Sequence, residues 1–298
     1  MGAALACADL FGLTAAQSVD AMGNVGSTAG GLWAFLEEGT STKQWHCGHA
    51  AWDAVLRAQL TGAGLRGPRH LMESARGFHA VLCPGAQPDQ LTIERGRRQI
   101  HDTSYKPWPP PRPTHAAITA ALEAHATIEG ARIERATLRT FGMAVDLCNH
   151  DPVATKHDAR FSLRHCTAVA LTRGAVDFDA FETPEIESQS ALVRSIEVGK
   201  DPAMSMAYPD RSQASLKVVL ADGRVLSRRV DHALGDPQLP LRRAALDAKH
   251  ARLVALTSNE ADAARLSNLS VLDRSGEQLV ELLRFGLRST GLRFVSAP

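Results

Sequence analysis

Lys43 and His46 are the first pair of side chains whose types and spacing could do chemistry. A helix is predicted from His46 to Leu60, which places this cation and this imidazole where it begins. Free backbone N–H groups and the partial positive charge of a helix N-terminus attract anions, so the pair could bind a carboxylate. The alternative is structural: His46 starts the helix and Lys43 is solvated.

A second group, Lys106, Arg112 and His115, brings two cations and an imidazole within ten residues of one another. Between them lies the segment 107–113, in which five of the seven residues are proline. Because proline donates no backbone N–H and has a fixed φ, this segment cannot be helical and is predicted to be a stiff loop at a domain boundary. Ligand clefts often open at such boundaries, although a rigid linker would have the same composition.

Metal and phosphate chemistry are not favoured by the remaining motifs. His46, Cys47 and His49 lie close in sequence, but no second ligand pair has zinc spacing. The cysteines are scattered and contain no C-x-x-C pair, which argues against a disulfide framework, a zinc ribbon and an iron–sulfur cluster. The glycines between Gly23 and Gly31 do not form a phosphate-binding loop. The site is therefore predicted to contain no metal and no cofactor.

Composition and charge narrow the class of protein further. The 298 residues are 44% hydrophobic and 22% charged, as in ordinary globular proteins. Lys and Arg number 33 against 32 Asp and Glu, so no net field would attract nucleic acid or a membrane surface. No apolar run approaches the roughly 18 residues of a membrane helix, and the start has no secretory pattern. A cytoplasmic protein with no nucleic-acid or membrane partner is expected.

Hydrophobic periodicity predicts the elements that must position these side chains. Helices are predicted at 3–11, 14–38, 46–60, 115–129 and 158–173, the second opening with a Thr14 to Gln17 capping box. Extended segments are predicted at 133–141, 195–199, 214–220 and 224–230. The last two form a hairpin, because Asp222-Gly223 suits a type I′ turn.

These elements predict a mainly α chain with an α+β second domain. Residues 1–103 are expected to form part of an all-helical domain, and 104–240 a smaller α+β lid. From 241 to 298 the helical period returns, and these helices are expected to pack back on the first domain.

The order of the motifs resembles the MmgE/PrpD family, whose members include 2-methylcitrate dehydratase and cis-aconitate decarboxylase. The resemblance is carried by Lys43-Gln-Trp-His46-Cys-Gly48-His-Ala50-Ala51, Lys106-Pro-Trp-Pro109 to His115, Gly67-Pro68, and Phe161-Ser162, and it covers essentially the whole chain. Two positions depart from the family pattern: Pro111 replaces a polar residue and His165 replaces a tyrosine. The resemblance also implies an N-terminal helical portion with an acidic residue and a histidine, and the chain is expected to lack it.

The resemblance implies a cofactor-independent lyase acting on a di- or tricarboxylate, foremost a 2-methylcitrate dehydratase of propionate catabolism. Removing a proton beside a carboxylate and expelling hydroxide requires a base, an acid and cations. The predicted catalytic residues are Lys43, His46, Lys106 and His165, and the predicted substrate-binding residues are Arg112, His115 and Ser27. A homodimer is implied by the family alone. A catalytically inactive truncated remnant, a carboxylate-binding protein, and a decarboxylase or epimerase of a related acid stay open as alternatives.

Overall fold

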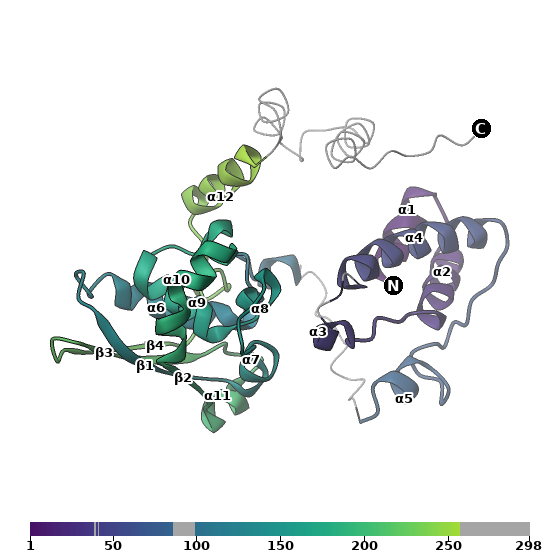
Figure 1. Ribbon diagram of the computed structural model, residues 1–298. Helices are drawn as coiled ribbons and strands as arrows, with labels where there is room; N and C mark the ends of the chain where they lie inside the picture. The colour runs from purple at the N-terminus through teal and green to yellow at the C-terminus, as the bar shows by residue number, and fades with distance from the viewer. Residues whose placement is uncertain (39, 41, 86–98, 257–298) are drawn as a thin grey trace. The chain divides into compact units, whose positions relative to one another are not determined.

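The computed structural model describes residues 1–38, 40, 42–85 and 99–256. The chain divides into two compact units, Met1–Arg98 and Gln99–Pro298 (Figure 1). The described part of the first unit is helical, and the second combines helices with one four-stranded sheet. The predicted fold class, a helical domain and an α+β domain in a mainly α chain, is confirmed, although the α+β unit is the longer of the two.

Three helices of the first unit pack on one another in pairs: α1 (Gly2–Leu10), α2 (Ala15–Ser27) and α4 (Thr42–Gly62). Small side chains permit the close contacts, because Ala4, Ala8, Ala21, Ala54 and Ala58 are all buried. The capping box of α2 is present as predicted, with the Thr14 hydroxyl accepting a hydrogen bond from the Gln17 amide at 3.3 Å. Short helices α3 (Phe35–Glu38) and α5 (Phe78–Leu82) complete the described part.

The Gly67-Pro68 motif has a packing role in this unit. A Cβ atom on Gly67 would lie 2.0 Å from the Asp20 carbonyl oxygen, so only glycine permits this approach to α2. The carboxylate of Asp20 is held by the guanidinium of Arg69, with Arg69 Nε 2.8 Å from Asp20 Oδ1. These contacts join the 67–69 segment to α2.

Two helices predicted in the first unit have different boundaries in the structure. The predicted helix 14–38 ends at Ser27, and a non-helical stretch with Gly31 at φ +119° separates it from α3. The predicted helix 46–60 begins four residues earlier, at Thr42. His46 therefore lies one turn inside α4, and of the predicted anion-binding pair only Lys43 is in the first turn.

The sheet of the second unit has the strand order β2-β1-β3-β4. Its strands are β1 (Ile133–Thr140), β2 (Ile196–Lys200), β3 (Ala214–Leu220) and β4 (Val225–Val230). Strand β1 pairs with β2 in parallel and with β3 antiparallel, and β3 pairs antiparallel with β4. The hairpin is confirmed, but its turn is not type I′. The Gly223 amide donates to the Leu220 carbonyl at 3.0 Å, so the central residues of the turn are Ala221 and Asp222. Neither has the positive φ that a type I′ turn requires, and only Gly223, the fourth residue, has one.

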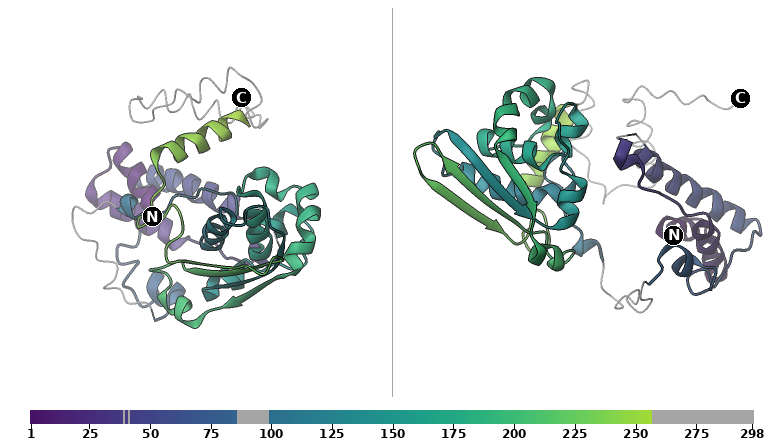
Figure 2. Two further views of the ribbon diagram at one scale, coloured as in Figure 1. Left: turned by 90° about the vertical axis from the view of Figure 1, so that its left-hand side faces the viewer. Right: turned by 60° about the horizontal axis from the view of Figure 1, so that its bottom comes forward.

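Helices α6 (His115–His125), α9 (Leu163–Arg173) and α10 (Thr183–Arg194) lie over one face of this sheet, as Figures 1 and 2 show. Strand β3 alternates buried and more exposed side chains, so its inner residues face these helices. Helices α6 and α9 are buried on nearly all sides, which explains their many alanines and threonines. The main hydrophobic core is the layer between these helices and the sheet.

Several predicted boundaries in the second unit are wrong. The predicted helix 158–173 is two helices, α8 (Lys156–Arg160) and α9, because Ser162 caps α9 by accepting a hydrogen bond from the His165 amide at 3.3 Å. Helix α6 ends at His125 instead of Glu129. The remaining elements are η2 (Gln99–Asp102), η3 (Arg112–Thr114), α7 (Gly142–Leu147), η4 (Phe178–Phe181), α11 (Pro202–Ala207) and α12 (Arg243–Ala255).

Helix α12 belongs to the second unit. The return of 241–298 to the helical domain stays a prediction, and its part from 257 onward lies outside the described residues. Among the residues that are described, we find no helix with the length and apolar character needed to cross a membrane.

Candidate functional site

The proline-rich loop that carries Lys106 is attached to the rest of the second unit through its backbone. The Tyr105 amide donates a hydrogen bond to the Gly235 carbonyl at 2.8 Å. Gly235 has φ +96°, and a Cβ there would lie 2.2 Å from the Tyr105 carbonyl oxygen. A larger residue at 235 would therefore push the loop away.

Arg112 connects the same loop to the turn after β4. Its guanidinium forms an ion pair with Asp236 and donates to the Leu234 carbonyl at 3.0 Å. Asp236 also accepts a hydrogen bond from the Ser104 hydroxyl at 2.6 Å. Burial raises the pKa of Asp236, but the hydrogen bonds from Ser104 and Arg112 outweigh it and hold that pKa below its usual value. The carboxylate is therefore charged at neutral pH.

His115, the first residue of α6, is buried beneath this loop. Arg112 can only donate, so its contact at 3.0 Å makes His115 Nδ1 the acceptor, and Nε2–H donates to the Pro110 carbonyl at 3.2 Å. The Trp108 ring lies 5.1 Å from the imidazole, centroid to centroid. Burial, followed by the charge of Arg112, lowers the pKa of His115 to about 3. The imidazole is neutral and positions the loop.

A pocket of about 650 Å³ opens beside the loop. Lys106 lines it together with three further cations, Arg160, Lys249 and Arg252, while its carboxylates are Asp177 and Asp179. The rest of the lining is apolar and consists of Pro107, Trp108, Pro109, Val176, Phe178, Leu253, Ala255 and Leu256. The four cations exceed the two carboxylates by two positive charges. The volume of the pocket is sufficient for a small organic acid.

Both carboxylates of the pocket are already in ion pairs. Asp177 pairs with Arg252, and Asp179 pairs with Arg173 at 2.6 Å. The hydrogen bond from Arg173 lowers the pKa of Asp179, so it remains charged. An incoming anion therefore meets two carboxylates whose charge is neutralised by neighbouring guanidinium groups.

His165 lies behind the pocket wall. Its side chain is fully buried, and Nε2 donates to the Ala180 carbonyl in η4 at 2.8 Å. Residues Phe178 and Asp179 of the same short helix line the pocket, so His165 supports that wall from inside. Burial lowers the pKa of His165. Its Nδ1 has no hydrogen-bond partner among the described residues, and its predicted role in proton transfer stays a prediction.

The other predicted residues lie in the first unit. Lys43 is exposed in the first turn of α4, and His46, half-buried one turn later, packs edge-on against Phe35 with ring centroids 5.5 Å apart. Ser27 is the last residue of α2 and is exposed. A Cβ on Gly31 would lie 3.8 Å from His46 Nδ1, so the small-residue segment after α2 approaches this histidine. The predictions for Lys43, His46 and Ser27 stay untested.

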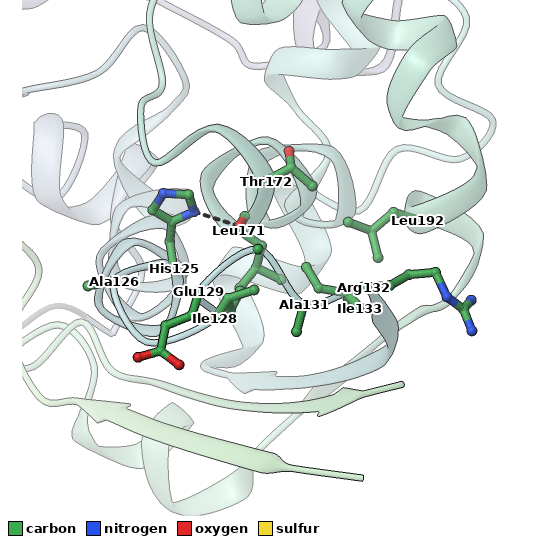
Figure 3. Close-up of a pocket in the computed structure, with 11 residues that line it drawn as sticks. His125, Ala126, Ile128, Glu129, Ala131, Arg132, Ile133, Leu171, Thr172 and Leu192 are labelled. Atoms are coloured by element: carbon green, nitrogen blue, oxygen red, sulfur yellow. Dashed lines mark hydrogen bonds between the residues drawn. The ribbon is translucent and has the colours of Figure 1, made fainter. Parts of the chain in front are cut away.

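A second pocket, of about 560 Å³, lies between the end of α6, the end of α9 and the start of β1 (Figure 3). Its polar groups do not converge. Figure 3 shows Arg132 and Glu129 directed to opposite sides, and Glu129 pairs with Arg224 at 3.2 Å. His125 Nδ1 donates to the Leu171 carbonyl at 2.8 Å. The pocket beside Lys106 is therefore the better candidate.

Sequence reasoning did not identify Arg160 or Arg252 as members of the site. Arg160 precedes the Phe161-Ser162 motif, a position that could have drawn attention to it. Arg252 lies 146 residues after Lys106 and carries no local signal. Within the described ranges, no group of three or more His, Cys, Asp or Glu side chains is arranged to hold a metal ion.

Comparison with known proteins gives matches over both units. A family model described as the MmgE/PrpD C-terminal domain matches residues 108–272, and one described as the MmgE/PrpD N-terminal domain matches residues 1–91. Cis-aconitate decarboxylase of Mus musculus is 24% identical over 253 residues, 81% of this chain and 51% of that protein. The Homo sapiens protein of the same name is 25% identical over 261 residues, 84% of this chain and 53% of that protein.

The chain therefore spans about half the length of the curated relatives it matches. The match of the N-terminal domain model to residues 1–91 gives no support to the expectation that the N-terminal part of the helical domain is missing.

Proposed function

Because the chain belongs to the MmgE/PrpD family, we propose that it is a lyase acting on a di- or tricarboxylate, with 2-methylcitrate dehydration as the reaction. The observation that carries the proposal is the pocket beside Lys106, in which cations outnumber carboxylates. A substrate with two or three carboxylates needs several cations around it, and they must be held in place before it binds.

Dehydration breaks a C–H bond next to a carboxylate and a C–O bond on the neighbouring carbon. The proton goes to a base, the hydroxyl leaves with a proton as water, and a double bond forms between the two carbons. Negative charge develops on the carboxylate beside the carbon that loses its proton, so a fixed ammonium there stabilises the transition state. We assign this role to Lys106.

The residues around Lys106 support this assignment. The loop is stiffened by its prolines, tied to Gly235, and attached through Arg112 to Asp236. Arg112 and His115, predicted to bind substrate, are engaged with each other and with the protein, so we assign them the positioning of this loop.

A second candidate reaction is decarboxylation of a related unsaturated acid. It is favoured by the two relatives, both of which are named cis-aconitate decarboxylase. The same cationic pocket would hold the carboxylates that are not lost. The two reactions differ in substrate and product, so the choice between them is made by assay.

The test is Lys106→Ala, with turnover of 2-methylcitrate and of cis-aconitate followed by ultraviolet absorbance of the unsaturated acid. Removing one preorganised charge should reduce kcat on the order of 10²- to 10³-fold. The contact from Lys249 Nζ to the backbone carbonyl of Lys106, at 2.6 Å, does not depend on the Lys106 side chain, so the loop should keep its place.

Lys217→Ala is the matched control, because Lys217 is an exposed lysine on β3 that does not line the pocket. Its turnover should equal that of the unsubstituted chain. Equal turnover in Lys106→Ala, or no turnover of either acid by the unsubstituted chain, would contradict the proposal.

A further inference from the structure

Helix α12 connects two walls of the pocket beside Lys106. Lys249 and Arg252 line this pocket, and a spacing of three residues places them on one face of the helix. From this face, the Lys249 ammonium donates a hydrogen bond to the Lys106 carbonyl, on the wall formed by the proline-rich loop. Arg252 pairs with Asp177, which lies directly before η4 on another wall. One helix thus holds two segments that are distant in the sequence.

The helix is itself attached to the second unit. Most of its side chains are exposed, whereas Val254 is buried and Arg252 is paired with Asp177. Val254 and Arg252 lie within two helical turns of Lys249, so the part of α12 that carries this lysine is held in place. Lys249 therefore reaches the loop from a fixed backbone.

The loop that carries Lys106 depends on side-chain contacts of this kind. Five of the seven residues in 107–113 are prolines, which have no backbone N–H group, so the loop has few hydrogen-bond donors of its own. Its two ends are held by Gly235 and, through Arg112, by the turn after β4. Between these ends, the ammonium of Lys249 lies 2.6 Å from the Lys106 carbonyl oxygen and holds the backbone of Lys106 itself.

The Lys249 contact restricts the backbone from which the Lys106 amine extends. Hydrogen bonds from a charged donor are stronger than those between neutral groups. Because Lys106 precedes Pro107, its backbone is already biased towards extended conformations. With its carbonyl held as well, the freedom that remains to the amine is mainly that of the side chain. This restriction matters because a reacting group displaced by about 1 Å can lose on the order of 10²-fold in rate.

We propose that Lys249 is a positioning residue, whose ammonium holds the backbone of Lys106 and thereby fixes where the Lys106 amine enters the pocket. Arg252 supports it by attaching α12 to the wall at Asp177. The inference rests on the proposed function for the reaction that the amine serves. The holding of the loop, in contrast, is measured without turnover.

The first measurement is the quenching of Trp108 fluorescence by acrylamide, in the full chain without ligand. The other tryptophans are exposed residues of the first unit and are replaced by phenylalanine: Trp33, Trp45 and Trp52. Trp108 is half-buried two residues after Lys106, so release of the loop should expose it. Lys249→Met keeps an apolar side chain of similar length but removes the donor, and it should raise the quenching constant.

Three variants accompany Lys249→Met in this measurement. Lys249→Arg keeps a charged donor and should leave the quenching constant nearly unchanged. Lys249→Ala serves as the second variant if Lys249→Met does not fold, and it should raise the constant as well. The control is Arg243→Met, because Arg243 on α12 is exposed, pairs with Asp247 and does not line the pocket.

The second measurement asks whether Lys249 acts through Lys106, by a double-mutant cycle on kcat for the acid that the chain turns over. In the chain that has Lys106, Lys249→Met should lower kcat roughly 10- to 100-fold, because the amine is displaced. In the Lys106→Ala background no amine is left to position, so the same substitution should change kcat by no more than about twofold. A residue that only added charge to the pocket would have the same effect in both backgrounds.

An unchanged quenching constant in Lys249→Met, or an equal rise in Lys249→Arg or Arg243→Met, would overturn the holding of the loop by Lys249. Equal losses of kcat in the two backgrounds would overturn its positioning role. If the unsubstituted chain turns over neither acid, the proposed function is refuted, and the quenching of Trp108 alone decides whether Lys249 holds the loop.

Discussion

Mild acid should destabilise the second unit through His115. Its folded-state pKa of about 3 lies far below the usual value of about 6.5, because the imidazole is buried beside Arg112. Between these two values the unfolded chain binds a proton at this site and the folded chain does not. The free energy of unfolding therefore falls as the pH falls through this window. From pH 7 to pH 5 the loss from His115 alone is about 2 kcal/mol.

The measurement is urea unfolding at pH 7 and pH 5 in a chain in which Trp33, Trp45 and Trp52 are replaced by phenylalanine, so that Trp108 is its only tryptophan. The Trp108 ring lies 5.1 Å from the His115 imidazole and reports on that region. This chain, without a substitution at a histidine, is the unsubstituted reference for the variants below. The pH-dependent loss in the unsubstituted chain is compared with the loss in His115→Gln. A glutamine amide can accept from Arg112 and donate to the Pro110 carbonyl, but it does not titrate. The variant should therefore lose about 2 kcal/mol less than the unsubstituted chain over this interval.

His101→Gln is the control, because His101 is an exposed histidine of the same unit. It should lose as much free energy on acidification as the unsubstituted chain. Burial also lowers the pKa of His165, so His115→Gln should keep part of the acid sensitivity. If His115→Gln and the unsubstituted chain lose the same free energy between pH 7 and pH 5, the assignment of a buried neutral imidazole at this position is refuted.

Two further substitutions test the contacts that hold the second unit together, both by thermal unfolding. Asp236→Asn removes the charge opposite Arg112 and should destabilise the second unit by about 2 kcal/mol, which lowers its Tm by roughly 4–8 °C. The control is Asp247→Asn, which removes one partner of an exposed ion pair and should leave the Tm nearly unchanged. Equal shifts would contradict the importance of the Asp236 pair. Gly174→Ala should destabilise more than Gly130→Ala: both have positive φ, but only at Gly174 would a Cβ meet a side chain, His125, at 2.5 Å. The opposite order would contradict this packing.

Local patterns predicted much of the α+β unit. The alternation in Ala214–Leu220 reflects one face packed on helices, and the hairpin follows from two such strands joined by a glycine turn. The type I′ turn was wrong because Asp222 keeps a negative φ and only Gly223 adopts the left-handed conformation. The predicted helix 158–173 is divided at Ser162, which caps α9 by accepting a hydrogen bond from the His165 amide. Serine is a common helix N-cap, so the sequence does contain this signal. A prediction from hydrophobic periodicity alone does not detect it.

The candidate site could be predicted only in part, because its contacts join distant segments. Lys106 and the stiffness of its loop follow from the local sequence. The partner of Arg112 does not, since Asp236 lies 124 residues away and its position depends on how the strands are paired. The burial of His115 was also hidden, because a histidine at the start of a helix is commonly exposed and only the tertiary fold covers it.

Arg112 and His115 restrict the backbone freedom of the loop that carries Lys106, and this restriction favours ligand binding. A flexible lysine must lose side-chain and backbone freedom when it binds a ligand, and this loss opposes binding. Here the prolines, the Arg112–Asp236 pair and the neutral imidazole remove much of the backbone freedom before any ligand arrives. If His115 were charged, it would repel Arg112 and Lys106, both of which lower its pKa. A neutral histidine beneath the loop is thus the condition under which two cations can be held above it. Because the folded chain keeps this imidazole neutral down to its pKa of about 3, the free energy of unfolding should fall between pH 7 and pH 5 while the support that His115 gives to the loop in the folded chain stays unchanged.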